Sequence, residues 1–169
     1  MAKYDDASWH YGGDYPEDLP NENAAFHIGM FITWCIENDL MSDEQIDDNK
    51  DDILTVKRHE MTGGKFLIKN CDEKFSDYDL CKTGNNFAKD YYKDDTKFGK
   101  KYNSYTDDFC DVFNITVDEN GYVSKSLYYV EETWKNYELI KKVIDKRFLE
   151  WKEYKEKSKN NMNHLNILL

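Results

Sequence analysis

The stretch NENAAFHIGMFITWCIENDL, residues 21–40, decides the fold. Its apolar side chains fall on every side of a helix, so that almost no polar face remains before Glu37. The alternation of apolar and polar residues that is typical of a half-buried strand is absent. We therefore expect a helix over about 22–39 that lies at the centre of the protein, with the other elements packed around it.

Helical patterns continue along most of the chain. Residues 42–61 predict a surface helix that begins after Ser42, because acids fill its first turn and one narrow apolar stripe runs along it. The segment GKFLIKNCDEKF, residues 64–75, and the region around Tyr91 predict two shorter helices. Aromatic residues between 98 and 113 recur at helical spacing and predict one more.

The C-terminal part has the clearest helical period. In residues 130–157, large apolar side chains from Trp134 to Trp151 recur every three or four positions, which predicts an amphipathic helix of about 25 residues. Before it, Asn120-Gly121 lies between β-favouring residues, which indicates a small hairpin near 115–129. The predicted fold class is therefore mainly α, a single-domain helical assembly around a buried first helix, with at most this small β-hairpin.

The domain boundaries follow from the same patterns. Residues 1–157 are expected to form a single globular domain with an ordered N-terminal arm over 1–20, where two prolines and a glycine pair forbid a regular helix. Residues 158–169 have no cap and no clear period. They are expected to form a tail, either disordered or docked in a groove.

The charge of the chain is concentrated in its first half. Residues 1–84 hold 8 Lys and Arg against 19 Asp and Glu, which accounts for the whole net charge of −11, while residues 85–169 hold 15 of each. Such a surface repels phosphate backbones and anionic membranes, so we expect no nucleic-acid and no membrane partner. It would attract a basic protein. In the simpler interpretation, the acids only keep the protein soluble.

No compositional sign of export or of a cofactor is present. The chain opens without the charged and apolar regions of a signal peptide, so we expect a cytoplasmic protein with reduced cysteines. The four cysteines lie at least ten residues apart and form no C-x-x-C pair, which removes support for zinc-knuckle and thioredoxin-like sites. We expect no cofactor.

The arm DDASWHYGGDYPEDLP, residues 5–20, contains the strongest candidate for chemistry. His10 and Asp14, together with His27 of the first helix, could form a metal site with two imidazoles and one carboxylate. The two histidines are seventeen residues apart, whereas such sites usually show a short fixed spacing. The alternative is structural: His27 is a core histidine, and the arm caps the end of the buried helix.

Two surface features were also considered as binding sites. Asp47, Asp48, Asp51 and Asp52 form the densest acidic run, and Tyr78 is one of several tyrosines beside acids, a composition typical of protein-recognition surfaces. The segment TGGK, residues 62–65, has the outline of a phosphate loop but lacks the P-loop frame. A turn that breaks a helix is the better interpretation of it.

Several blocks together resemble a known family. KYDDASWHYGGDYPEDLP, HIGMFITWCIENDL, CDEKFSDYDL, GNNFAKDYY and SLYYVEETWKNYELIKKVIDKRFLEW are similar to a family of small uncharacterised bacterial proteins, a domain of unknown function, over residues 3–151. The resemblance implies a bacterial, cytosolic protein and little about its chemistry. Small acidic proteins of this kind look like the immunity proteins that neutralise bacterial toxins.

These observations lead to two functional hypotheses. The first is a non-catalytic cytoplasmic binding protein, an immunity-type inhibitor of a basic toxin or effector, bound through the acidic run and Tyr78. The second is a small enzyme, such as a metal-dependent hydrolase, that uses the His10, Asp14 and His27 region. Absence of an assembled catalytic motif favours the first. The oligomeric state stays open.

Overall fold

The computed structural model describes the backbone of residues 2–116 and 126–167 and the side chains as far as residue 160. This part of the chain is a mainly helical single domain with one small two-stranded sheet, which confirms the predicted fold class. In chain order the elements are β1 (Lys3–Asp6), α1 (Ala7–Tyr11), the 3₁₀ helix η1 (Asn21–Ala25), α2 (Phe26–Glu37), α3 (Asp43–Lys57), α4 (Gly63–Asn70), β2 (Lys74–Ser76), α5 (Lys82–Tyr91), α6 (Lys97–Tyr102), α7 (Tyr105–Val112), the 3₁₀ helix η2 (Leu127–Tyr129) and α8 (Trp134–Ile167).

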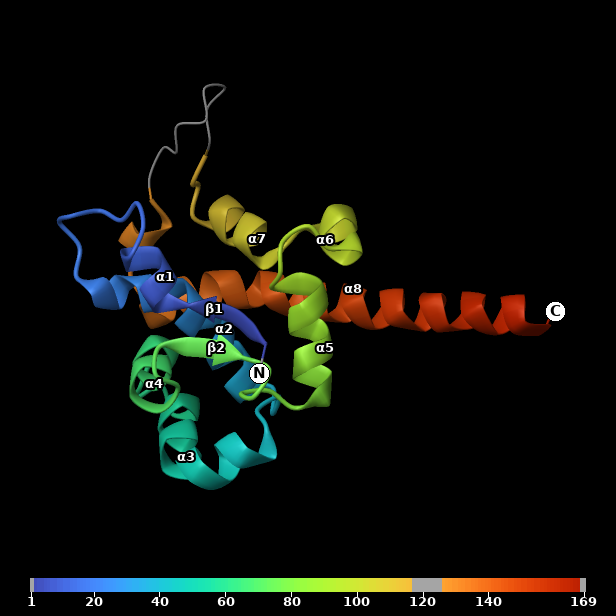
Figure 1. The fold of residues 1–169 in the computed structure, drawn as a ribbon, viewed down its shortest axis with the longest axis horizontal. Helices are drawn as coiled ribbons and strands as arrows, with labels where there is room; N and C mark the ends of the chain where they lie inside the picture. Colours follow the sequence, from blue (N-terminus) through green and yellow to red (C-terminus); the bar gives the residue numbers. More distant parts are fainter. Residues whose placement is uncertain (1, 117–125, 168–169) are drawn as a thin grey trace.

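Helix α2 lies at the centre of the domain, as its sequence predicts. Every residue from 27 to 36 is buried, and the helix contacts α3, α4 and α8 (Figure 1). The ring of Phe31 lies within an aromatic cluster formed by residues of α2, β2, α5 and α7 and by Tyr92. Its neighbours are Trp34, Phe75, Phe87, Tyr91, Tyr92 and Tyr105.

Glycines allow α2 and α4 to approach at backbone distance. A Cβ added to Gly29 would lie 2.0 Å from the amide nitrogen of Gly64, and one added to Gly63 would lie 2.0 Å from the carbonyl oxygen of Gly29. The hydroxyl of Thr33 accepts a hydrogen bond from the Gly63 amide at 3.1 Å, which fixes the crossing. No side chain larger than hydrogen fits at this crossing without moving a backbone.

Helix α8 packs across the domain and then extends beyond it (Figure 1). Its buried side chains, Tyr137, Ile140, Ile144 and Trp151, follow the predicted apolar stripe. The helix continues to Ile167, so most of the expected tail over 158–169 is the end of α8.

A buried ion pair joins α7 to α8. Arg147 donates to both carboxylate oxygens of Asp108, at 2.7 and 2.8 Å, and the Tyr91 hydroxyl of α5 donates to the same carboxylate at 2.9 Å. Both charged side chains are nearly inaccessible to solvent. This pair therefore fixes the relative positions of three helices.

The sheet is not the one that the sequence predicts. Strand β1 pairs antiparallel with β2, and its register is irregular between Lys3 and Asp5. The turn of the expected hairpin near 115–129 falls in residues 117–125, which lie outside the described residues, and residues 127–129 form η2. A pairing between residues about seventy positions apart has no signature in local periodicity.

Two helix boundaries also differ from the predicted ones. Helix α4 ends at Asn70 rather than continuing to Phe75, because Asp72 and Glu73 have φ angles of 52° and 61°. The aromatic stripe over 98–113 belongs to two helices, α6 and α7. Asn103, with φ of 114°, separates them, and Ser104 begins the second with a capping box.

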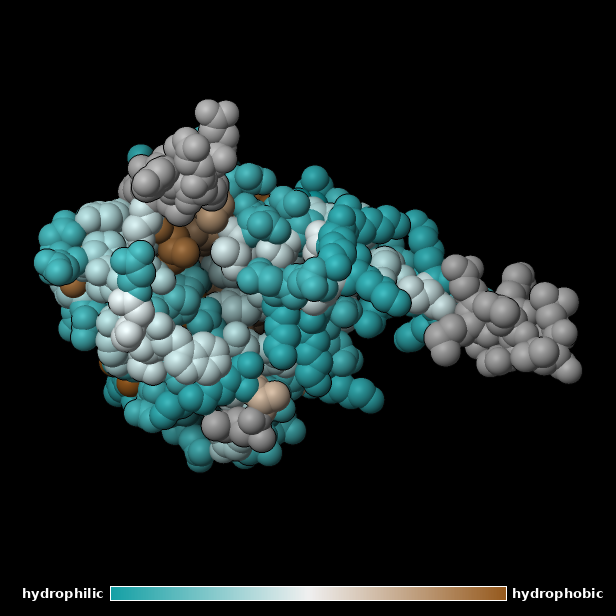
Figure 2. All heavy atoms as spheres, turned by 45° about the horizontal axis from the view of Figure 1, so that its top comes forward, coloured by the Kyte–Doolittle hydropathy of each residue, from teal (hydrophilic) through white to brown (hydrophobic). Residues whose placement is uncertain are grey.

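The surface is hydrophilic over most of the face in Figure 2, where apolar residues appear as small separate spots. No helix in the described part of the chain is long and apolar enough to cross a membrane.

Candidate functional site

The first candidate site brings together residues from three elements near the N-terminus. Asp5 lies in β1, His10 in α1, and His27 in the first turn of α2. Pairing with β2 fixes β1, and the Asp6 carboxylate caps α1 by accepting from the Ser8 amide at 3.0 Å. This cap turns the chain directly after Asp5, so that His10 folds back over it.

The Asp5 carboxylate is the centre of the cluster. One oxygen lies 2.7 Å from Nε2 of His10 and accepts from the Asp6 amide at 2.8 Å. The other accepts from the Tyr92 hydroxyl at 2.7 Å and lies 3.4 Å from Nε2 of His27. On the far side of the His10 ring, Nδ1 is 2.8 Å from the Tyr128 hydroxyl.

These contacts define the charge state of the cluster. Burial alone would raise the pKa of Asp5, but hydrogen bonds from His10 and His27 outweigh it and hold that pKa well below its usual range. Burial lowers the pKa of His27, so this ring is neutral at pH 7. Burial raises the pKa of Tyr128 to about 12, and its hydroxyl keeps its proton. The resting cluster is therefore one carboxylate surrounded by donors.

His27 is the least satisfied member of the cluster. Its side chain is only 7% exposed, and its Nδ1 has no hydrogen-bond partner among the described residues. The 3.4 Å from its Nε2 to Asp5 is long for a hydrogen bond between charged and neutral groups. Buried polar atoms are nearly always paired, so this ring stands out.

The cluster opens onto a pocket of about 460 Å³. Besides the cluster, residues of β1, α1, α7, η2 and the segment directly after α5 line it, namely Tyr4, Trp9, Tyr92, Lys93, Asp94, Thr106 and Leu127. The potential ligand atoms of Asp5, His10 and His27 all lie within 4.8 Å of one another. The arrangement can therefore hold a small cation or bind a polar group that enters the pocket.

The structure differs from the sequence hypothesis in one member of this site. His10 and His27 lie together, with ring centroids 4.8 Å apart. Asp14, however, is exposed and lines a separate pocket with Tyr15 and Ser126, and the carboxylate beside the histidines is that of Asp5. Asp5 stands five residues before His10 in an acidic run, and only the β1–β2 pairing distinguishes it from its neighbours.

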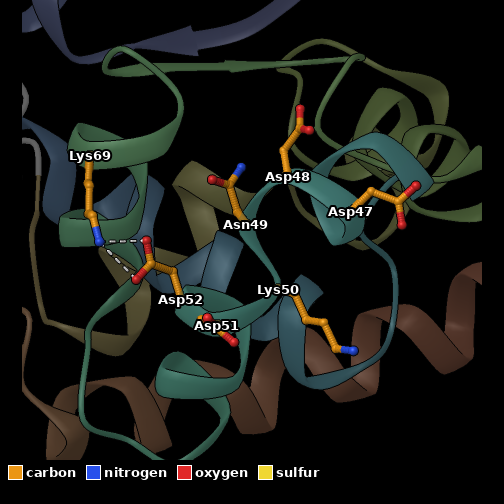
Figure 3. Close-up of a pocket in the computed structure, with 7 residues that line it drawn as sticks. All are labelled: Asp47, Asp48, Asn49, Lys50, Asp51, Asp52 and Lys69. Carbon is orange, nitrogen blue, oxygen red and sulfur yellow. Dashed lines mark hydrogen bonds and ion pairs between the residues drawn. The ribbon is translucent and has the colours of Figure 1, made fainter.

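The acidic run lies on α3, whose axis bends at Asn49, where φ is −126° and ψ is 28°. Asp47, Asp48 and Asp51 are exposed, and their carboxylates have no hydrogen bond or ion pair within the described part of the chain. Figure 3 shows these side chains pointing in different directions around a shallow pocket of about 380 Å³. They do not converge on one point, so the run is a charged surface rather than a metal site.

Asp52 differs from the other acids of α3. It is partly buried and bonded to Lys69 at 2.8 Å and to the Asn70 amide at 3.0 Å, and hydrogen bonds from these two residues lower its pKa (Figure 3). Its charge is already compensated within the chain. Tyr78, 49% exposed, lies at a neighbouring pocket of about 260 Å³.

An apolar groove runs along another side of α3. Ile46 and Leu54 are 40% and 42% exposed, and with Met41 and Ile53 they line a groove of about 190 Å³, flanked by Lys50 and Lys57. The narrow apolar stripe expected along residues 42–61 includes Ile46 and Leu54, and these two side chains are not buried but line the groove. The bend at Asn49 explains the difference, since it shifts the helical phase between them.

The glycine pair begins α4, with the Thr62 side chain as its cap. The anion position at this helix terminus is filled by the chain itself: Glu132 accepts from the Gly64 amide at 2.7 Å. Burial raises the pKa of Glu132 to about 7. A phosphate site here would require displacement of Glu132.

The cysteines show no sign of activation. All four are free, and burial raises the pKa of Cys35, Cys71 and Cys110. A thiol with a raised pKa is a poor nucleophile at pH 7.

Comparison with known proteins identifies the family. The model of the domain of unknown function DUF7832 matches residues 3–124, and the chain belongs to this family. No curated protein and no solved structure matches the chain significantly. The matched region contains Asp5, His10, His27 and the acidic helix α3, and it ends before Leu127 and Tyr128 of the first site and before α8.

Proposed function

We propose that this member of the DUF7832 family is a non-catalytic binding protein, an immunity-type inhibitor whose helix α3 docks a basic bacterial toxin or effector. One observation carries the proposal: α3 places three exposed carboxylates, which make no hydrogen bond or ion pair with the described residues, near an exposed apolar groove. Apolar anchors within a charged rim are the usual composition of a protein interface.

The two parts of this surface have different roles. Asp47, Asp48 and Asp51 attract a basic partner over distances of about 8 Å at physiological salt, which raises the association rate. Ile46 and Leu54 provide the short-range contribution. Burying the exposed fraction of each side chain stabilises a complex by about 1 kcal/mol.

The surface is held in place before any partner arrives. The Asn49 side chain donates to Gln45 at 2.8 Å, and Gln45 donates in turn to the buried Asp79 at 2.8 Å. Two further bonds from Ser76 to Asp79, at 2.7 and 3.0 Å, complete the network. A fixed bend lowers the entropic cost of binding.

The step from a basic partner to a toxin rests on the size and acidity that this chain shares with immunity proteins. An inhibitor of this kind would cover a basic active site, where a nucleic acid or another anionic substrate binds. The negative charge of such an inhibitor would raise its rate of association with the basic toxin. It would also help the inhibitor to compete with an anionic substrate for the active site.

The test compares two triple variants of equal net charge. One carries Asp47→Asn, Asp48→Asn and Asp51→Asn on α3. The control carries Glu138→Gln, Glu153→Gln and Glu156→Gln, which are exposed acids on α8. Each is used to capture partners from an extract of the producing cells at low and high salt, and captured proteins are expressed alone and together with the chain.

We expect the wild type and the α8 control to capture one basic protein, with an association rate that falls as salt rises, and the α3 variant to lose it. Expressed alone, that protein should arrest growth, and co-expression of the wild-type chain should restore it. Equal capture by both variants, a partner that is not basic, or a partner without toxicity would refute the proposal.

A further inference from the structure

We propose that Asp5, His10 and His27 bind one divalent transition-metal ion, with its remaining coordination positions directed into the 460 Å³ pocket. This inference goes beyond the proposed function, because it uses none of the α3 residues. Helix α4 and strand β2 lie between α3 and α1 in Figure 1, so the two sites are separate.

The distances within the cluster suit coordination. A metal with bonds of about 2.1 Å holds adjacent ligand atoms about 3.0–3.4 Å apart. The Asp5 carboxylate lies 2.7 Å from Nε2 of His10 and 3.4 Å from Nε2 of His27, and all three ligand atoms fall within 4.8 Å. The two contacts with Asp5 are made by different carboxylate oxygens and are close to this range, whereas the widest spacing in the set, up to 4.8 Å, would have to shorten by about 1.4–1.8 Å around one ion.

The ligand types suit a particular class of metal. Two imidazoles and one carboxylate on one side of an ion form the facial set found with Fe(II), and the same donors bind Zn²⁺ and Co²⁺. All three residues meet beside the same pocket, so an ion bound by them would be reached from it.

The state of His27 is the second, independent observation. His27 is only 7% exposed. Its Nδ1 has no hydrogen-bond partner among the described residues, and its Nε2 makes only the 3.4 Å contact with Asp5. Leaving a buried polar group without a partner costs about 1–3 kcal/mol. A coordinate bond from Nε2 would replace this weak contact, while Nδ1 would still have no partner among the described residues.

The surrounding residues support the ligands unequally. The Tyr128 hydroxyl lies beside Nδ1 of His10 and can accept a hydrogen bond from Nδ1–H when Nε2 binds a metal, while the Tyr92 hydroxyl donates to the second oxygen of Asp5. Nδ1 of His27 has no such support among the described residues. Supporting contacts change metal affinity by about 10–100-fold each, so we expect a moderate affinity that depends on Tyr128.

The residues that line the pocket determine which molecules could bind next to the ion. Lys93 and Asp94 lie in its wall, and Trp9, 57% exposed, stands at its edge. An ion held by three protein ligands keeps positions for water or for an oxygen atom of a bound molecule. The enzyme hypothesis from the sequence depends on this site, with Asp5 in the place of Asp14.

The test uses Zn²⁺ and Co²⁺ with the full chain purified without chelator. Metal content is measured by elemental analysis, affinity by calorimetry, and ligand type by the visible spectrum and the hyperfine-shifted NMR signals of the Co²⁺ form. The variants are His10→Gln and Asp5→Asn, which remove ligands, and Tyr128→Phe, which keeps them. His59→Gln is the control, because His59 lies on the surface and stacks on Trp134.

We expect one metal ion per wild-type chain and shifted signals from two histidine rings. His10→Gln and Asp5→Asn should weaken binding at least about 100-fold, Tyr128→Phe by about 10–100-fold, and His59→Gln not at all. Absence of binding by the folded wild type, unchanged affinity in both ligand variants, or an equal loss in His59→Gln would overturn the proposal. If a ligand variant fails to fold, the NMR signals of the wild type decide: fewer than two coordinated histidines overturns it.

Discussion

Replacing Glu132 by Gln should make the stability of the protein less dependent on pH. Glu132 accepts a hydrogen bond from the Gly64 amide at the start of α4, and burial raises its pKa from 4.5 to about 7. A carboxyl whose pKa is raised on folding binds more protons in the folded state than in the unfolded state. Its contribution is therefore greatest below pH 4.5 and is lost as pH rises through 7.

The size of the effect follows from this shift. A change from 4.5 to about 7 corresponds to about 3 kcal/mol of unfolding free energy once the carboxyl is ionised in both states. About 2 kcal/mol of it falls between roughly pH 5.5 and 8. Gln has the shape of the neutral acid and cannot ionise, so the variant should gain about 2 kcal/mol over the wild type across this range.

The assay is urea unfolding of both proteins at several pH values, followed by tryptophan fluorescence. Carboxylates with lowered pKa values, such as Asp5 and Glu37, act in the opposite direction, but they are common to both proteins and cancel in the difference. Glu131→Gln is the matched control, because this neighbouring acid is exposed. A difference between wild type and E132Q that does not change with pH would refute the reasoning, as would the same trend in E131Q.

Three further substitutions test the packing in the same urea assay. Gly29→Ala should destabilise by at least about 3 kcal/mol, since its Cβ would lie 2.0 Å from the Gly64 nitrogen, while Gly13→Ala should cost little; equal effects would contradict the close crossing. Arg147→Met should cost about 3–5 kcal/mol by leaving Asp108 buried without a counter-charge, against about 0.5 for the exposed Lys146→Met; a small loss for Arg147 would show that water reaches the pair. Ser104→Ala should cost about 1 kcal/mol through the α7 cap, and no loss would show that packing alone fixes the helix start.

Long periodic segments were the predictable part of this fold. The α2 segment is apolar on all sides, and only a position at the centre of the domain buries all sides of such a helix. The stripe from Trp134 to Trp151 likewise fixes one face of α8, and Ser42 caps α3 as expected, accepting from the Gln45 amide at 3.1 Å. Each of these patterns is contained within the residues of a single helix.

Breaks between elements were harder to predict. The aromatic stripe passes through Asn103 without interruption, because α6 and α7 both face the same core. The signal for the break was present as a serine followed three residues later by an acid, Ser104 and Asp107, which is a capping box. The bend at Asn49 has no comparable signal, since it depends on Gln45 and the distant Asp79.

The candidate metal site was partly accessible to sequence reasoning. Residue type alone singled out His10 and His27, which the fold brings together. The carboxylate could not be chosen, because many acids lie near His10 in the sequence and tertiary pairing selects Asp5. Tyr92 and Tyr128 join from positions far along the chain, and no local pattern connects them to the histidines.

The position of α8 has a consequence for how the chain is made. Helix α2 leaves the ribosome well before Tyr137, Ile140 and Ile144 of α8, the helix that covers one of its faces. Until then, the face of α2 that α8 will cover and the Gly64 amide that Glu132 will bind are both open to solvent. One face of α2 therefore stays uncovered in the nascent chain until α8 has been synthesised, and the domain can close only after that point.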